Sequence, residues 1–167
     1  IPIGSPDDRG AGIAMAEAVG GRLINMDEGF VSLPFYPPAS LTFGILVNGE
    51  GKRFINEDVY HGRAGTLVLD QPWPVYFIVS VEDYADYETV SYLGAPIAGT
   101  GETLAELCAE LDLPAGALAR TIEVYNAGAA VGIDSDLHKQ AEWLKPLKAP
   151  LVALDCTPGR GAFFPYF

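Results

Sequence analysis

One stretch of the chain, Gly44–Arg63 with the sequence GILVNGEGKRFINEDVYHGR, constrains the fold more than any other. Its apolar, strand-type residues are Ile45, Val47, Phe54 and Ile55. Between them lie an Asn-Gly pair and a Glu-Gly pair, and glycine adopts the positive φ angles of tight hairpin turns without steric cost. The stretch therefore predicts a β-hairpin that delivers a run of polar residues into a short loop.

The polar run at the end of this hairpin is unusually dense. Its members are Asn56, Glu57, Asp58, Tyr60, His61 and Arg63. A loop held by a rigid hairpin is a typical place for binding or catalytic groups. A solvated turn produces the same pattern, so the residues alone leave both interpretations open.

The composition and the periodicity predict an α+β fold in which a mixed small sheet is joined to a helical hairpin. The chain has 167 residues, which fits one domain or one large domain with pieces of another. Hydrophobic residues make up 49% of it, which is enough for a sizeable core. Its 19 glycines and 13 prolines favour many turns and short elements over a helical bundle.

The best strand in the sequence is Pro74–Ser80, a nearly continuous β-branched and aromatic run that is expected to be buried on both faces. A helix is predicted at Thr100–Leu111, with Thr100 as its cap, and a second helix at Ala115–Ala130. The other expected elements are a helix at Arg9–Val19, a helical turn at Val81–Tyr87, strands at Arg22–Met26, Ala149–Leu154 and Ala162–Phe167, and a polar surface loop at Ile133–Lys148.

Charge and cysteine usage exclude several classes of protein. The formal net charge is −12, with 22 acidic against 10 basic residues, which argues against a nucleic-acid partner and against an anionic membrane surface. No apolar run approaches the roughly 20 residues of a membrane span, and no signal segment opens the chain. Cys108 and Cys156 are expected to be free thiols in a reducing cytosol, so a cytoplasmic localisation is predicted. No His, Cys and carboxylate residues have metal-ligand spacing, and no metal site is expected.

Four stretches, taken in order, resemble one family. Gly44–Glu57 resembles the GI-VN--GKRF-NE segment of the fumarate reductase and 3-ketosteroid dehydrogenase group of FAD-dependent oxidoreductases. Gly10–Gly20 is similar to the small-residue helix of that family, and Leu104–Asp136, which contains TIEVYNAGAAVGIDSD, is similar to its YN---A-G-D-DF segment. The Thr157–Gly159 tripeptide is similar to the TPG that precedes the family's re-entry strand.

The resemblance implies a particular domain organisation. Family members have a Rossmann-like FAD domain that is split around an inserted cap, or catalytic, domain. Residues 1–30 are accordingly expected to be a helix and strand at the edge of the FAD-binding domain, residues 31–155 the cap domain, and residues 156–167 the re-entry strand. The chain begins and ends abruptly, as is expected of a piece of a longer protein.

The cofactor implied by the resemblance is FAD. The chain has no GxGxxG fingerprint after a strand, so the parts that cradle the FAD pyrophosphate are expected to lie elsewhere in a longer parent, and this chain alone is not expected to hold FAD tightly. The expected partners are a missing FAD-binding domain and a small apolar substrate. Self-association is also expected, because a missing domain leaves apolar surface uncovered.

The resemblance also suggests catalytic residues. In such enzymes the flavin N5 exchanges a hydride with the substrate, and a protein acid or base handles the partner proton. Fumarate reductases place an arginine four residues after the NE glutamate, where this chain has His61, and the nearest arginine is Arg63. Ketosteroid dehydrogenases use one tyrosine in this loop and one in the re-entry strand, and Tyr60 and Tyr166 match those places. The expected apolar walls of the substrate pocket are Phe30, Phe35, Tyr36, Phe163 and Phe164.

Other interpretations remain open at this stage. The predicted reaction is oxidation or reduction of a carbon–carbon bond next to a ketone, with a ketosteroid-like substrate. The alternatives are a fumarate- or succinate-type dicarboxylate reductase and a non-catalytic module that binds a small ligand or a protein. Tyr60 has the alternative role of a packed loop aromatic, and Arg63 that of an ion-pair partner of Asp58 or Glu57.

Several residues near the predicted site are expected to be structural. Asn56 and Glu57 are expected to hold the loop by hydrogen bonds to the backbone rather than to contact substrate. Arg53 is expected to pair with an acid at the hairpin. Tyr125 and Asn126, which match the family's YN, are expected to pack and cap the end of their helix.

Overall fold

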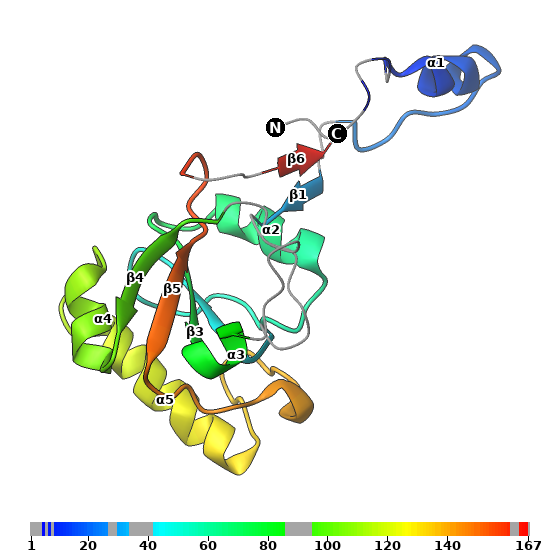
Figure 1. The fold of residues 1–167 in the computed structure, drawn as a ribbon. Helices are drawn as coiled ribbons and strands as arrows, with labels where there is room; N and C mark the ends of the chain where they lie inside the picture. Colours follow the sequence, from blue (N-terminus) through cyan, green and yellow to red (C-terminus); the bar gives the residue numbers. More distant parts are fainter. Residues whose placement is uncertain are drawn as a thin grey trace.

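The structure, a computed structural model, describes residues 5, 7, 9–26, 30–33, 42–85, 95–160 and 164–166, with the side chains of residues 30, 32, 85 and 164–166 excepted. The strands are β1 (Phe30–Ser32), β2 (Ile45–Val47), β3 (Tyr76–Ser80), β4 (Ile97–Gly101), β5 (Leu151–Asp155) and β6 (Phe164–Tyr166) (Figure 1). The helices are α1 (Ala11–Ala18), α2 (His61–Leu69), α3 (Val81–Ala85), α4 (Leu104–Glu110), α5 (Ala117–Val131) and the 3-10 helix η3 (Ala141–Trp143).

A four-stranded sheet with the order β2-β3-β5-β4 forms the centre of the protein. Every neighbouring pair in it is antiparallel, and Ile78 of β3 lies opposite Ala153 of β5 in the register. The predicted α+β class is therefore confirmed, although the sheet is antiparallel throughout rather than mixed. The predicted strands Pro74–Ser80 and Ala149–Leu154 correspond to the two central strands.

Both faces of this sheet are covered, which explains the continuous apolar runs of its strands. Side chains alternate across a strand, so Ile45 and Ile78 face a core under α4 and α5, whereas Leu46 and Phe77 face a second core under α2 (Figure 1). All residues of β2, β3 and β5 are buried. The expected burial of the central strand on both faces is confirmed.

The predicted hairpin at Gly44–Arg63 is wrong in its second half. Strand β2 pairs with β3, and residues 52–55 contribute one isolated bridge, between Val47 and Arg53. The Asn48 side chain closes the turn, because its Oδ1 accepts hydrogen bonds from the backbone amides of Glu50 at 3.1 Å and Lys52 at 3.2 Å. The chain then turns inward and buries Ile55 in the core under α2 instead of continuing as a strand.

Three further expectations for local structure are corrected. Thr100 lies in strand β4 rather than capping a helix, and the actual cap is Thr103, whose Oγ1 accepts a hydrogen bond from the Glu106 amide at 3.2 Å. Residues 22–26 do not form a strand. The polar run ends in a helix rather than a loop, because His61 is the first residue of α2.

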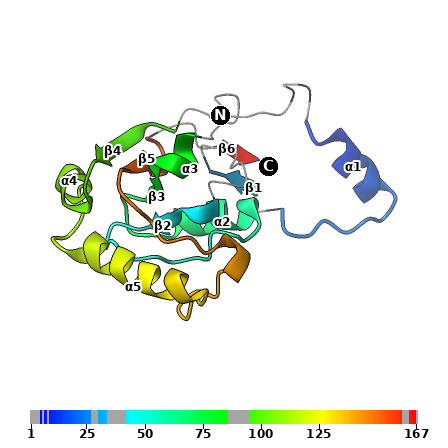
Figure 2. The same ribbon diagram turned by 60° about the horizontal axis from the view of Figure 1, so that its bottom comes forward.

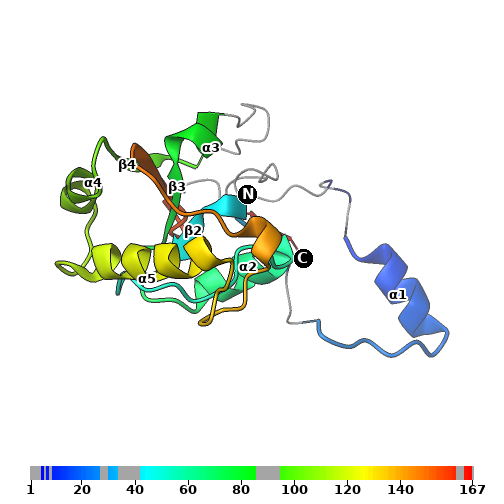
Figure 3. The same ribbon diagram turned by 90° about the horizontal axis from the view of Figure 1, so that it is seen from below.

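Helix α1 stands apart from the main body (Figure 3). None of its residues is buried, and the apolar side chains of Met15 and Val19 are 67% and 87% exposed. The expected small-residue helix is therefore present, but no described part of the chain covers it. In the described ranges, no helix combines the length and the apolar composition that a membrane span requires.

The two-sided sheet predicts a large stability difference between two isoleucine variants. Ile78→Ala should lower the free energy of unfolding by about 2–5 kcal/mol, because it leaves a cavity in a closely packed core. Ile97→Ala, in a side chain that is 51% exposed on the edge strand β4, should cost less than about 1 kcal/mol. Urea unfolding of the two variants measures both values, and equal losses would contradict the described packing.

Candidate functional site

A cavity of about 160 Å³ opens where the polar run meets helix α2. Its walls come from the chain before α2, the first turns of α2, the sheet and a segment of residues 133–148 that we call the strap. The lining residues are Leu33, Thr42, Leu46, Glu57, Asp58, Val59, His61, Ala64, Phe77 and Trp143. The Trp143 ring also contacts the Phe43 ring, with the ring centroids 5.9 Å apart.

The structure places two of the predicted catalytic residues at the start of α2. His61 is half-buried and lines the cavity. Burial lowers the pKa of His61, and a hydrogen bond with the Leu33 backbone opposes the shift without cancelling it. The imidazole is therefore neutral at neutral pH. Tyr60 is the N-cap residue of α2 and is 72% exposed, so it is not a packed loop aromatic.

Arg63 lies on the exposed side of α2 and does not line the cavity. The alternative role of Arg63, an ion pair with Asp58 or Glu57, is not seen in the described part of the chain, where Glu57 pairs with Arg53 and Lys139 and Asp58 accepts hydrogen bonds from Asn56 and Gln140.

The strand that carries Tyr166 lies close to α2. Strands β1 and β6 pair antiparallel, with Phe30 opposite Tyr166 and Ser32 opposite Phe164. Helix α2 packs against β1, so β1 connects the two segments that carry the predicted tyrosines (Figure 2). The backbone thus brings β6 and the start of α2 to the same end of the protein. Three of the predicted pocket residues lie outside the described residues, namely Phe35, Tyr36 and Phe163.

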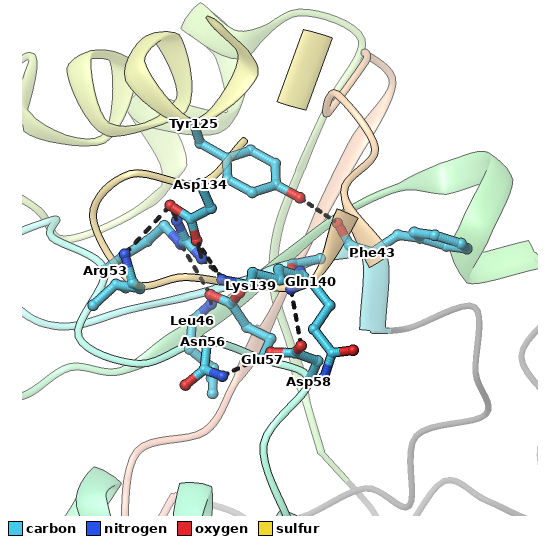
Figure 4. Close-up of polar contacts among 12 residues, drawn as sticks. Phe43, Leu46, Arg53, Asn56, Glu57, Asp58, Tyr125, Asp134, Lys139 and Gln140 are labelled. Carbon is cyan, nitrogen blue, oxygen red and sulfur yellow. Dashed lines mark hydrogen bonds and ion pairs between the residues drawn. The ribbon is translucent and has the colours of Figure 1, made fainter. Parts of the chain in front are cut away.

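A buried network of charged side chains lies behind the cavity (Figure 4). At its centre is Glu57, whose side chain is 2% exposed. Its Oε1 accepts hydrogen bonds from Arg53 Nε at 3.1 Å and from the Leu46 amide at 3.0 Å. Its Oε2 pairs with Arg53 Nη2 at 2.8 Å and with Lys139 Nζ at 3.2 Å. Glu57 therefore ties the polar run to β2, as expected, and anchors two cations.

Arg53 also pairs with a second acid, and Arg53 and Lys139 share one aromatic ring. Arg53 donates to both carboxylate oxygens of Asp134, at 3.2 and 3.0 Å, in addition to its pairing with Glu57, the acid of the predicted hairpin. The Tyr125 ring centre lies 4.8 Å from the Arg53 guanidinium carbon and 5.5 Å from Lys139 Nζ, within the range of cation–π contacts. The two cations balance Glu57 and Asp134, so the network is electrically neutral.

The network shifts the pKa values of its members. Burial alone would raise the pKa of Asp134, but hydrogen bonds and the charge of Arg53 outweigh burial and lower it. Burial lowers the pKa of Lys139, although the charge of Glu57 opposes that shift. Burial and the Glu57 charge raise the pKa of Tyr125 to about 12, so its phenol stays protonated and donates to the Phe43 carbonyl at 3.3 Å.

The residue next to Glu57 is also fixed from two directions. Asp58 accepts a hydrogen bond from Asn56 Nδ2 at 2.8 Å and another from the Gln140 backbone amide at 3.0 Å. Asn56 therefore holds the polar run through this side-chain contact as well as through its backbone carbonyl, which accepts a hydrogen bond from the Val59 amide at 3.2 Å. The conformation before Tyr60 and His61 thus depends on contacts with the strap.

The sequence did not identify the strap as part of the site. The strap is not a simple surface loop, because Lys139 and Leu147 are buried. Asn126 does not cap its helix; from the middle of α5 its side-chain amide donates to and accepts from the Leu147 backbone, at 2.9 and 2.8 Å. The signal for Tyr125, Asn126 and Asp134 was their place in a motif that accompanies GKRF-NE. Lys139 gave no signal.

Comparison with known proteins gives relatives but no match to a family model. The chain is 31% identical over 171 residues to NADH:acrylate oxidoreductase of Vibrio harveyi, a match that covers 92% of this chain. It is 27% identical over 175 residues to fumarate reductase (cytochrome) of Shewanella frigidimarina, with 95% of this chain covered. The crystal structure of a 3-ketosteroid-Δ4-(5α)-dehydrogenase from Rhodococcus jostii RHA1, in complex with 4-androstene-3,17-dione, matches 94% of this chain with a TM-score of 0.75 and 39% identity.

The chain spans only part of each of these proteins. The matches cover 17% of the acrylate oxidoreductase, 30% of the fumarate reductase and 33% of the ketosteroid dehydrogenase. Both branches of the predicted family are nevertheless among its relatives, and each match covers most of this chain. The family predicted from the sequence is therefore confirmed for this segment.

The buried network predicts a pH-dependent stability defect for Asp134→Asn. The variant loses one charge of a buried ion pair, so its free energy of unfolding at pH 7 should be about 3 kcal/mol lower than that of the unchanged protein. The folded-state pKa of Asp134 is below its unfolded value, so its contribution is present above the unfolded pKa and is lost as the pH falls through the folded pKa. The difference in the free energy of unfolding between Asp134→Asn and the unchanged protein should therefore become smaller below about pH 4.

Urea unfolding between pH 3 and pH 7 measures this deficit. Asp136→Asn, an exposed acid two positions away, is the matched control and should show little defect at any pH. A constant Asp134→Asn deficit across this range would contradict the role given to the Arg53–Asp134 pair.

Proposed function

We propose, on the premise that its relatives are 3-ketosteroid dehydrogenases and fumarate reductases, that this chain is the substrate-facing cap domain of an FAD-dependent oxidoreductase. The reaction we propose takes place at a carbon–carbon bond next to a ketone, and the proposed substrate is ketosteroid-like. Residues 31–155 would form the cap, residues 1–30 an edge of the FAD-binding domain, and residues 156–167 the strand that re-enters that domain.

The observation that carries this proposal is the charge of the cavity at the start of α2. Among the described residues that line it, the ionisable ones are Glu57, Asp58 and His61, and none is an arginine or a lysine. Burial keeps His61 neutral, and Arg53 and Lys139 face the buried network instead. A cavity with this lining suits an uncharged substrate and repels a dicarboxylate. The charge of the lining therefore favours the predicted ketosteroid-like substrate over the dicarboxylate alternative.

The proposed roles follow from the chemistry of the residues near the cavity. A phenol donates a hydrogen bond to a ketone oxygen, or as a phenolate accepts a proton from a carbon that the ketone activates. Tyr60, at the N-cap of α2, and Tyr166, on β6, are the proposed phenols. Leu33, Phe77 and Trp143 supply apolar surface in the cavity wall against which one end of such a ligand could pack. FAD, when bound, accepts or donates the hydride.

We propose that this chain does not hold FAD tightly by itself. Helix α1 follows Gly10, which has a left-handed conformation with φ 75°, but no strand among the described residues leads into the helix. The strand–turn–helix unit that binds a dinucleotide pyrophosphate therefore has no counterpart there. We propose that FAD is held by other parts of a longer protein and that the exposed apolar residues of α1, such as Met15, pack against those parts.

A chimera tests the proposed function directly. The segment of the Rhodococcus jostii ketosteroid dehydrogenase that matches this chain is replaced by residues 1–167. The chimera should bind 4-androstene-3,17-dione, turn over the parent enzyme's ketosteroid substrate and leave fumarate unreduced. A chimera that folds with bound flavin but reduces fumarate and ignores the steroid would support the dicarboxylate alternative instead.

Within that chimera, Tyr60→Phe should lower kcat on the ketosteroid by about 10²- to 10⁴-fold, because it removes the proposed proton-transfer group. Tyr84→Phe is the control, because it removes a phenol from α3, a helix that contributes no described residue to the cavity lining, and it should leave kcat nearly unchanged. Steady-state kinetics with both variants gives the comparison. Unchanged turnover in Tyr60→Phe would rule out the proposed role of Tyr60 in proton transfer, but it would not change the family to which the segment is assigned.

A further inference from the structure

The strap is fixed to the rest of the domain at both ends. At its start, Asp134 accepts hydrogen bonds from Arg53 and from the backbone amides of Leu137 and Lys139. Towards its end, Lys145 pairs with Glu82 and Asp83 at 2.7 Å each. The Lys148 amide then donates to Ser80 Oγ at 2.8 Å, and Asn126 clamps Leu147. A segment anchored at both ends in this way can fix the position of the residues that it contacts between the anchors.

What lies between the anchors is the polar run before α2. The Lys139 side chain is 0% exposed, and its Nζ contacts Glu57 Oε2 at 3.2 Å and the Gly44 carbonyl oxygen at 2.8 Å. The next residue, Gln140, donates its backbone amide to Asp58 at 3.0 Å. Two consecutive strap residues therefore hold two consecutive residues of the run, and His61 follows only a few positions later (Figure 4).

We propose that Lys139 is a positioning residue which, together with the Gln140 backbone amide, sets the place of His61 at the cavity and of its neighbour Tyr60. Lys139 belongs to the strap, and its Nζ contacts Glu57 in the polar run and the Gly44 carbonyl just before β2. One atom therefore joins three segments of the chain. Its significance for catalysis rests on the function proposed above. Its effect on the conformation of the run does not, and can be measured on this chain alone.

A cation in this position costs free energy to bury, so a purely space-filling role would be served equally well by an apolar residue. Lys139 instead completes the charge balance of the network and joins the strap to Glu57 and to the Gly44 carbonyl. Glu57 keeps Arg53 and the Leu46 amide as partners when Lys139 is replaced, so the network does not collapse as a whole. The expected loss is local and falls on the run from Asn56 to His61.

The first test compares two lysines of the same strap in the 167-residue chain. Lys139→Met keeps the length of the side chain and removes the ammonium, whereas Lys145→Met removes an ion pair that does not contact the run. NMR titration of the His61 ring is the measurement. The chain has 2 histidines, and His138→Asn identifies their signals, since His138 has a φ of 60°, which asparagine tolerates.

Lys139→Met should raise the pKa of His61 towards its ordinary value, because a released run exposes the ring, and Lys145→Met should leave that pKa unchanged. The Val59 amide, which donates to the Asn56 carbonyl, should exchange with solvent about tenfold faster in Lys139→Met than in Lys145→Met. An unchanged His61 titration and unchanged Val59 exchange in a folded Lys139→Met chain would overturn the proposal.

The second test removes the neighbouring contact without altering a buried charge, in case Lys139→Met does not fold. Gln140 has a φ of −64°, which proline requires, so Gln140→Pro deletes the amide that donates to Asp58 with little change in backbone angle. Gln140→Ala retains the amide and is the matched control. Gln140→Pro should raise the His61 pKa, and Gln140→Ala should not. Identical His61 titrations for the two variants would contradict the proposal even if the chimera were active on ketosteroids.

Discussion

The Arg53–Glu57 pair is the interaction on which the rest of the site depends. It joins the turn after β2 to the polar run, and through Asp134 and Lys139 it reaches the strap that follows α5. Removing one member of such a network leaves an uncompensated charge in a region that excludes water, which is far more costly than losing a surface pair. The position of the cavity wall is therefore set by buried electrostatics, while the apolar core sets the overall fold.

The antiparallel sheet provides the rigid base for this network. Because β2, β3 and β5 are buried on both faces, the start of β2 is held by two cores at once. Gly44 and Leu46, at that start, are the backbone partners of Lys139 and Glu57. The charged groups thus act on a strand that cannot shift easily, so they fix the position of the run that leads into α2.

Sequence reasoning could predict the features that depend on local pattern. The apolar run of β3, the helix α5 and the ordered family motifs lie in contiguous residues, and the relatives confirm the family they indicate. The prediction of a second hairpin strand failed because burial of Ile55 in the core outweighed its strand-like sequence pattern. The contact between Arg53 and Asp134 could not be predicted, since the two residues are 81 positions apart and no local pattern pairs them, although each lies in a family motif.

A crystal structure of the ketosteroid dehydrogenase chimera with 4-androstene-3,17-dione bound would show directly where the substrate lies. We expect the steroid to lie against the cavity at the start of α2, with a ketone oxygen within about 3 Å of the Tyr60 hydroxyl. A steroid bound with neither His61 nor Tyr60 in contact would contradict the claim that this cavity is the substrate site.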